Sequence, residues 1–164
     1  MKESMSFRGT FRVVCVDKRG QVQWMDDAPN TVVNVGLVHT INLLFVGSAE
    51  TQIDPWYVGL VGTSPTVAAA DTASSHTGWT EFLSYAANRK EFINARSAQS
   101  VSNSASAATF VISTAGTVGG AFLVSATSGS GGTLLCAAAL TGSNRTVADT
   151  DTVNVTYTFT SASA

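Results

Sequence analysis

Charged residues are scarce in this chain. Asp, Glu, Lys and Arg make up 12% of the 164 residues, whereas hydrophobic residues make up 45%. Typical soluble domains contain about 25% charged residues. Ser, Thr, Asn, Gln and the backbone must therefore supply most of the polar surface. Such an exterior suits a protein that buries much of its surface in an assembly.

A basic surface and a long apolar run are also lacking. The formal net charge is -2, which does not provide the positive patch that nucleic-acid binding needs. No run approaches the roughly 18 continuous apolar residues of a membrane helix. The N-terminal sequence MKESMSFRGTFR has no apolar signal-peptide core. We therefore expect no nucleic-acid partner and no membrane partner.

Cysteine is rare, and Cys15 and Cys136 lie far apart without a CxxC pair or a Cys/His cluster. Free cysteines are among the most buried residue types. The spacing favours two reduced structural thiols over a disulfide, and it predicts no metal site and no cofactor.

Histidine is equally rare, which limits the possible chemistry. His39 falls in a predicted helix, where a structural role is far commoner than a catalytic one. His76 ends the sequence DTASSH, which contains all three residue types of a catalytic triad but no nucleophile elbow. We expect Asp71 and His76 to hold a loop through hydrogen bonds, and we predict no catalytic residue.

The chain is organised around residues 31–62. The spacing of Leu37, Ile41 and Leu44 predicts a short helix near residues 34–46 with one buried face, widened by Val38 and Phe45. Either Asn30 or Asn34 could cap its N-terminus, and Gly47 could end it.

A run rich in aromatic and β-branched residues follows, bounded by Pro55 and Gly62. It predicts a strand buried on both faces. Trp56, Val58 and Leu60 are its expected core residues. Trp79 is also placed in the core, although the three tryptophans could instead line a carbohydrate site.

The pattern in the rest of the chain predicts short strands separated by turn residues. Residues 10–16 and 20–25 predict a hairpin. Four further strand-like runs lie at residues 108–113, 120–126, 133–140 and 152–160. In the last of them, apolar and polar residues alternate.

This pattern predicts a mostly β fold, an antiparallel β-sandwich of the jelly-roll kind, with one short helix. We expect one domain over residues 10–164, preceded by an N-terminal arm at residues 1–9. Residues 62–78 form a long connection that we expect on the surface, with possible contacts. Residues 79–92 fit both helical spacing and alternation, and we favour an extended segment with local turns.

Several of these segments together resemble a family of small virion structural proteins of tailed bacteriophages. The matching segments span most of the chain: Asn34-Val35-Gly36-Leu37, Trp56-Tyr57-Val58-Gly59-Leu60, Asp71 to Glu81 with Tyr85 and Arg89, Gly120-Ala121-Phe122-Leu123, Gly131-Gly132-Thr133-Leu134, and Asp151 to Val155. The resemblance implies a non-enzymatic component of the virion, made in the bacterial cytoplasm of the host.

Within that family, we expect a decoration or cement protein on the capsid exterior. Its partners would be the major capsid protein and further copies of itself, as a dimer or trimer. Phe7 and Arg8 in the arm, with Asp71 and His76 in the long connection, are the expected contact residues. The alternative is a tail or fibre component, which could bind a receptor or glycan.

Overall fold

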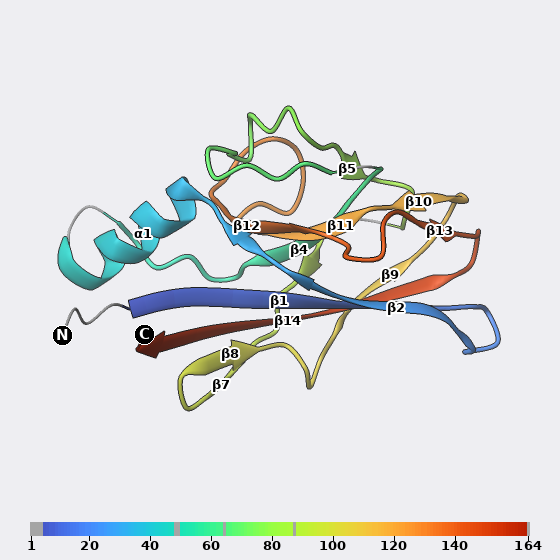
Figure 1. The fold of residues 1–164 in the computed structure, drawn as a ribbon, viewed down its shortest axis with the longest axis horizontal. Coiled ribbons are helices and arrows are strands. Elements are labelled where there is room, and N and C mark those ends of the chain that lie inside the picture. The colour runs from blue at the N-terminus through green and yellow to red at the C-terminus, as the bar shows by residue number, and fades with distance from the viewer. Residues whose placement is uncertain (1–4, 48–49, 64, 87, 164) are drawn as a thin grey trace.

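The computed structural model describes residues 5–47, 50–63, 65–86 and 88–163. Within these residues the chain is mostly β, with one helix and antiparallel sheets, as predicted. Figure 1 shows two sheets stacked face to face, with the helix at one end. The sandwich prediction is confirmed, whereas the jelly-roll order stays a prediction.

The first sheet has six strands, and its order is β2-β1-β14-β8-β7, with β9 also paired to β14. The strands are β1 (Met5–Val16), β2 (Val22–Pro29), β7 (Ala95–Ser97), β8 (Ser100–Ser102), β9 (Ala108–Val111) and β14 (Thr152–Ser163). The predicted hairpin is β1 and β2. At its turn, the Asp17 carboxylate accepts hydrogen bonds from the backbone N–H groups of Arg19 and Gln21.

The second sheet also has six strands, in the order β3-β12-β11-β4-β5, with β6 paired to β4. The strands are β3 (Thr31–Val32), β4 (Tyr57–Val61), β5 (Glu81–Phe82), β6 (Lys90–Glu91), β11 (Gly120–Val124) and β12 (Leu134–Ala139). A separate two-stranded ribbon pairs β10 (Gly116–Val118) with β13 (Arg145–Val147). β5 and β6 lie within residues 79–92, so the extended interpretation of that segment is confirmed.

The main core lies between the two six-stranded sheets. Alternate residues of β14 point into it, and Val153, Val155 and Tyr157 are completely buried. Val58 and Leu60 of β4 meet them from the opposite sheet and are also completely buried. Burying each such side chain contributes about 1.5–3 kcal/mol relative to leaving it exposed. The alternation in β14 is therefore the pattern that closes the sandwich.

A second, smaller core covers the outer face of the second sheet. Val61 and Phe122 point outward from β4 and β11, and Trp79 packs over Phe122 at 5.2 Å between ring centroids. β4 is thus buried on both faces, as predicted. The long connection over residues 62–78 lies on the surface, but part of it forms the cover of this core.

The expected N-terminal arm is wrong for residues 5–9. They belong to β1 and pair in register with the end of β14, from Met5 opposite Ser163 to Gly9 opposite Phe159. Phe7 stacks on Phe159 with 5.6 Å between ring centroids. Backbone pairing and this aromatic contact make residues 5–9 part of the sandwich, while residues 1–4 lie outside the described residues.

Candidate functional site

The single helix of the described residues, α1 (Asn34–Phe45), lies at the end of the sandwich where β1 starts and β14 finishes (Figure 1). Its N-cap residue is Val33, and no side chain caps it. The caps predicted at Asn30 or Asn34 are therefore wrong. The backbone of Val33 donates to Leu135 O and that of Asn34 to Ala69 O instead, so tertiary contacts fix the start of the helix. At the other end, Gly47 follows the helix with a φ of +50°.

The inner face of α1 packs against β12. Gly36 is buried, and a Cβ atom there would lie 2.5 Å from the backbone oxygen of Leu135. One turn later, His39 is 4% exposed. A helix of this length is marginal on its own in water, so it depends on this contact. The close approach at Gly36 fixes which face of the helix points inward.

The predicted apolar stripe is on the opposite face. Ile41 is 50% exposed and Leu44 is 58% exposed, and Leu37 is only half-buried. The assignment of Ile41 and Leu44 to the core is wrong, and Leu37 lies at its margin. The spacing correctly predicted one apolar face, but the contact at Gly36 turns that face away from the sheets.

A groove of about 500 Å³ lies beside α1, where the helix and residues 52–56 meet the end of the first sheet. Its lining includes Leu43, Ile53, Trp56, Val101 and Phe159. The polar groups at the groove come from His39, Thr40, Gln52, Asp54 and Asn94. No Lys or Arg is among its lining residues. The groove therefore presents polar and apolar surface in similar measure, and its polar groups are neutral or acidic.

His39 holds α1 to the segment that follows it. Its Nδ1 atom lies 3.1 Å from Glu50 Oε2, so the imidazole donates to the carboxylate. Its ring meets Trp56 edge-on at 5.9 Å between centroids. The buried Nε2 atom has no hydrogen-bond partner in the part of the chain that the structure describes. His39 thus has a structural role on one side of its ring and an unused polar atom on the other.

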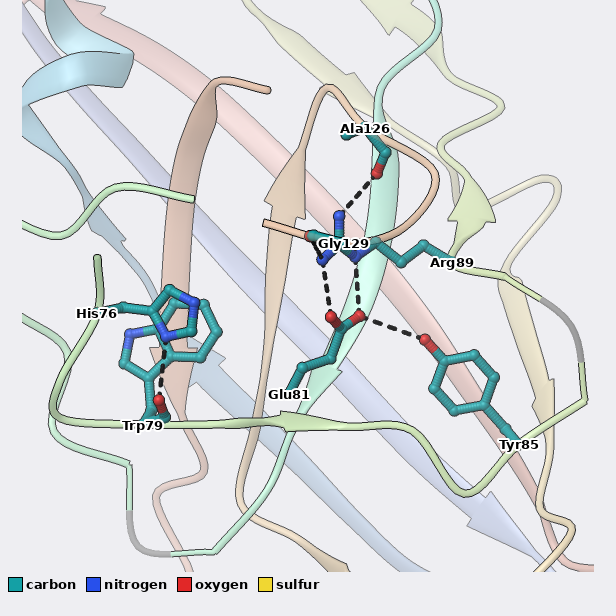
Figure 2. Close-up of polar contacts among 7 residues, drawn as sticks. All are labelled: His76, Trp79, Glu81, Tyr85, Arg89, Ala126 and Gly129. Atoms are coloured by element: carbon teal, nitrogen blue, oxygen red, sulfur yellow. Dashed lines mark hydrogen bonds and ion pairs between the residues drawn. The ribbon is translucent and has the colours of Figure 1, made fainter. Parts of the chain in front are cut away.

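The second histidine belongs to the loop that covers the outer core. The His76 ring stacks on Trp79 at 3.8 Å between centroids, and its Nδ1 atom donates to Trp79 O at 3.0 Å (Figure 2). Asp71 Oδ2 accepts from Trp79 Nε1 at 2.9 Å and from the backbone N–H of Ala68. Both residues hold the loop, as predicted, and they do so through Trp79.

These hydrogen bonds alter which of the predicted contact residues are available to a partner. Asp71 is 7% exposed, and its carboxylate is occupied inside the loop. Its assignment as a contact residue is therefore wrong. His76 and Phe7 are half-buried and Arg8 is exposed. Contacts through those three residues stay a prediction.

A buried ion pair anchors the hairpin loop between β11 and β12. Arg89 forms two hydrogen bonds with Glu81, at 2.8 Å from Nε and 2.7 Å from Nη2. The same guanidinium donates to the carbonyl oxygens of Ala126 and Gly129 (Figure 2). Burial raises the pKa of Tyr85, and the adjacent Glu81 carboxylate, which accepts from the Tyr85 hydroxyl at 3.5 Å, raises it further. Tyr85, Glu81 and Arg89 therefore act as one rigid support.

Both cysteines are free and buried, as predicted. Burial raises the pKa of Cys15 to about 12 and that of Cys136 to about 11. Thiols with such pKa values stay protonated at neutral pH and are poor nucleophiles. No group of three His, Cys, Asp or Glu side chains suited to a metal ion occurs among the described residues. Within the same residues, no helix has the length and hydropathy to span a bilayer.

The groove and its polar groups were not predicted from the sequence. Asp54, which lines the groove, and Glu50, which pairs with His39, are isolated carboxylates in the sequence, and nothing in their spacing connects them to His39. The packing of α1 on β12 had one signal in the sequence, which is Gly36. A glycine inside a helical pattern often marks a close approach of two backbones.

Comparison with known families adds the decisive observation. A family model described as "Podophage GP4 fiber I protein gp80" matches residues 33–161, which is well over half of the chain. The chain belongs to this family. It is a phage virion structural protein, as the resemblance implied. No match was found among curated proteins.

The region shared with the fiber I family begins at Val33, the N-cap of α1, and ends inside β14. It therefore includes the exposed helix, the groove and the support around Arg89. The family description names a fibre protein, so it favours the fibre alternative over capsid decoration.

Proposed function

We propose that this chain is a structural subunit of the phage tail fibre and that it works by binding other proteins. The match to the fiber I family over residues 33–161 carries the proposal. The low content of charged residues supports it, because a sparsely charged surface suits a protein embedded in an assembly. The exposed apolar face of α1 gives that assembly a candidate contact.

A non-enzymatic role is part of the proposal. Within the described residues, the imidazoles of His39 and His76 are engaged in ring packing and hydrogen bonds to Glu50 and Trp79. The cysteine thiols are buried and their pKa values are raised. A hydrolytic activity lost in folded His39→Ala or His76→Ala protein would contradict this part.

The location is tested by counting and imaging the chain in purified virions. A fibre subunit should be present in on the order of tens of copies or fewer, because a tail has few attachment positions. An antibody label should then lie at the tail. A capsid decoration protein binding the major capsid protein would instead give on the order of hundreds of copies spread over the shell. The second result would overturn the fibre assignment and restore capsid decoration.

A further inference from the structure

The sandwich is open at the end where α1 lies. β1 and β14 reach past the second sheet there (Figure 1), so the inner face of the first sheet continues without strands of the second sheet opposite it. Phe159 follows the completely buried Tyr157 by two residues on β14 and therefore points to the same side. Phe159 is only half-buried, and it lines the groove beside α1. The groove is thus the uncovered end of the main core.

Two aromatic rings that line the groove are held in place by the fold. Trp56 is half-buried, and the His39 ring meets it edge-on at 5.9 Å between centroids. The carbonyl oxygen of Trp56 accepts a hydrogen bond from Phe92 N at 2.8 Å. Phe159 is stacked on Phe7 at 5.6 Å between centroids, with 15° between the ring planes. Rings that are already fixed lose little conformational freedom when a ligand packs on them.

Amide and carboxylate side chains also line the groove. Gln52, Asp54 and Asn94 are exposed there, and Asn94 Nδ2 donates to Phe92 O at 3.2 Å. An amide both donates and accepts hydrogen bonds, and a carboxylate accepts them on two oxygens. No Lys or Arg is among the described lining residues. The groove therefore offers several hydrogen-bonding groups, but no positive charge for an anionic ligand.

The size and the mixed lining of the groove limit the class of ligand. Its volume of about 500 Å³ lies in the range of small-molecule sites, which is about 300–1,000 Å³. A wholly apolar ligand would cover the amides and the carboxylate without giving them hydrogen bonds in return, which weakens binding. The ligand that fits has an apolar side, a side with hydroxyl groups and no negative charge. A neutral sugar ring has both sides, because its C–H groups pack on an aromatic ring and its hydroxyls bond to amides and carboxylates.

We propose that the groove beside α1 binds a neutral saccharide. Trp56 and Phe159 supply the apolar contact. Gln52, Asp54 and Asn94 supply the hydrogen bonds to the hydroxyl groups. A quaternary ammonium ligand fits less well, because it uses the carboxylate and the rings but cannot hydrogen-bond to the two amides. The inference goes beyond the proposed function, because the ligand is a small molecule rather than another protein of the virion.

The test follows the tryptophan indole N–H signals of the purified full chain by NMR during titration with neutral sugars, namely glucose, galactose, mannose, rhamnose and N-acetylglucosamine. Each sugar is added up to about 100 mM, because ligands of so few atoms bind weakly. Trp56 lines the groove, whereas Trp24 and Trp79 lie outside it. The indole N–H of Trp24 donates to Thr146 O, and that of Trp79 donates to Asp71. At least one sugar should shift the Trp56 signal to saturation and leave the other two signals unchanged.

Two substitutions in the groove test the hydrogen bonds. Asp54→Ala should weaken binding of that sugar at least about 10-fold, because hydrogen bonds to a charged group are lost, and Gln52→Ala should weaken it about 3-fold or more. Gln23→Ala is the matched control, because Gln23 is an exposed glutamine on β2 that does not line the groove. It should bind as the wild type does. Both glutamines are exposed, so circular dichroism and the thermal midpoint should stay unchanged in these two variants.

Two results would overturn the inference. One is a Trp56 signal that none of these sugars shifts, and a shift with choline alone in a parallel titration would then mark a cation site instead. The other is a shift that is as strong in Asp54→Ala and Gln52→Ala as in the wild type, which would place the sugar outside the groove. Neither result bears on the fibre assignment, because that is decided by counting and imaging the chain in virions.

Discussion

At the scale of single residues, Asp26 is a carboxylate used entirely for structure. It lies on β2 and is 6% exposed. Its oxygens accept from the backbone N–H and the hydroxyl of Thr141 and from the backbone N–H of Gly142. Burial alone would raise the pKa of Asp26, but these hydrogen bonds and the nearby Arg145 outweigh it, and the pKa is lowered.

We predict that Asp26→Asn lowers the free energy of unfolding by about 2 kcal/mol at neutral pH, since hydrogen bonds to a charged acceptor are lost. A lowered pKa means that the folded state favours the carboxylate. This contribution is complete above the unfolded pKa and disappears as pH falls through the folded pKa. Urea unfolding of both proteins should therefore show a constant difference above about pH 5 that shrinks below about pH 4. A difference that grows on acidification would contradict this role.

Two arginine pairs provide a matched comparison of burial. In the Arg89–Glu81 pair the side chains are 5% and 14% exposed, whereas in Arg12–Asp27 they are 54% and 52% exposed. Removing one partner of a buried pair leaves an uncompensated charge and typically costs about 3–5 kcal/mol. Exposed pairs contribute about 1 kcal/mol or less.

Arg89→Met should therefore lower the free energy of unfolding by about 3 kcal/mol or more, and Arg12→Met by less than about 1 kcal/mol. Arg89→Lys should also be destabilising, because one ammonium group cannot reproduce the paired contact with Glu81 and reach both loop carbonyls. Denaturant unfolding measures all three. Equal losses for Arg89→Met and Arg12→Met would show that the ion pair does not anchor the hairpin loop.

At the scale of elements, the sequence predicted those strands whose own residues specify their burial. β14 was readable because Val153, Val155 and Tyr157 alternate with polar residues. β4 was readable because its apolar run is buried on both faces. Four strands were not predicted because each is only three residues long: β7, β8, β10 and β13. Three residues are too few to show the alternation of a strand, so such segments cannot be told from turns in the sequence.

The helix shows where sequence patterns stop being informative. The positions of Leu37, Ile41 and Leu44 predicted the helix correctly, but the prediction that the face they mark is buried is wrong. An apolar pattern shows which side of a helix is hydrophobic, but not whether another surface covers that side. In this fold, β12 packs against the side that carries Gly36. The groove was likewise unpredictable, because it joins α1 to residues 52–56 and to the end of β14.

The contact at Gly36 gives a test at this scale. Alanine favours a helix over glycine by about 1 kcal/mol, but its Cβ atom would lie 2.5 Å from Leu135 O and 2.9 Å from Leu135 Cα. Because backbone atoms cannot move aside easily, we predict a net loss of about 1–2 kcal/mol for Gly36→Ala. Gly131→Ala is the matched control, since nothing lies within 4 Å of a Cβ at Gly131. Urea unfolding midpoints measure both, and a stabilised Gly36→Ala protein would mean that α1 is not seated on β12.

At the scale of the whole molecule, the sandwich has two different ends. The start of β1, the finish of β14, α1 and the groove lie together at one end (Figure 1). The turn between β1 and β2, with Asp17, Lys18 and Arg19, lies at the other. The exposed apolar face of α1 and the charged turn are therefore separated along the length of the strands. This arrangement leaves the charged end free when the apolar end is covered.

Truncation of the chain tests the assignment of residues 5–9 to the β-sandwich. A chain that starts at Thr10 loses the pairing of these residues with β14, the stacking of Phe7 on Phe159, and the hydrogen bond from the Asn30 backbone to Gly9 O. We predict a loss of at least about 2 kcal/mol, because an aromatic pair alone contributes about 0.5–1.5 kcal/mol beyond its buried area. Phe7→Ala in the full chain separates the aromatic contact from the backbone pairing and should give a smaller loss. An unchanged thermal midpoint after truncation would instead identify these residues as an arm that the sandwich does not need, and it would make attachment to a partner their main role.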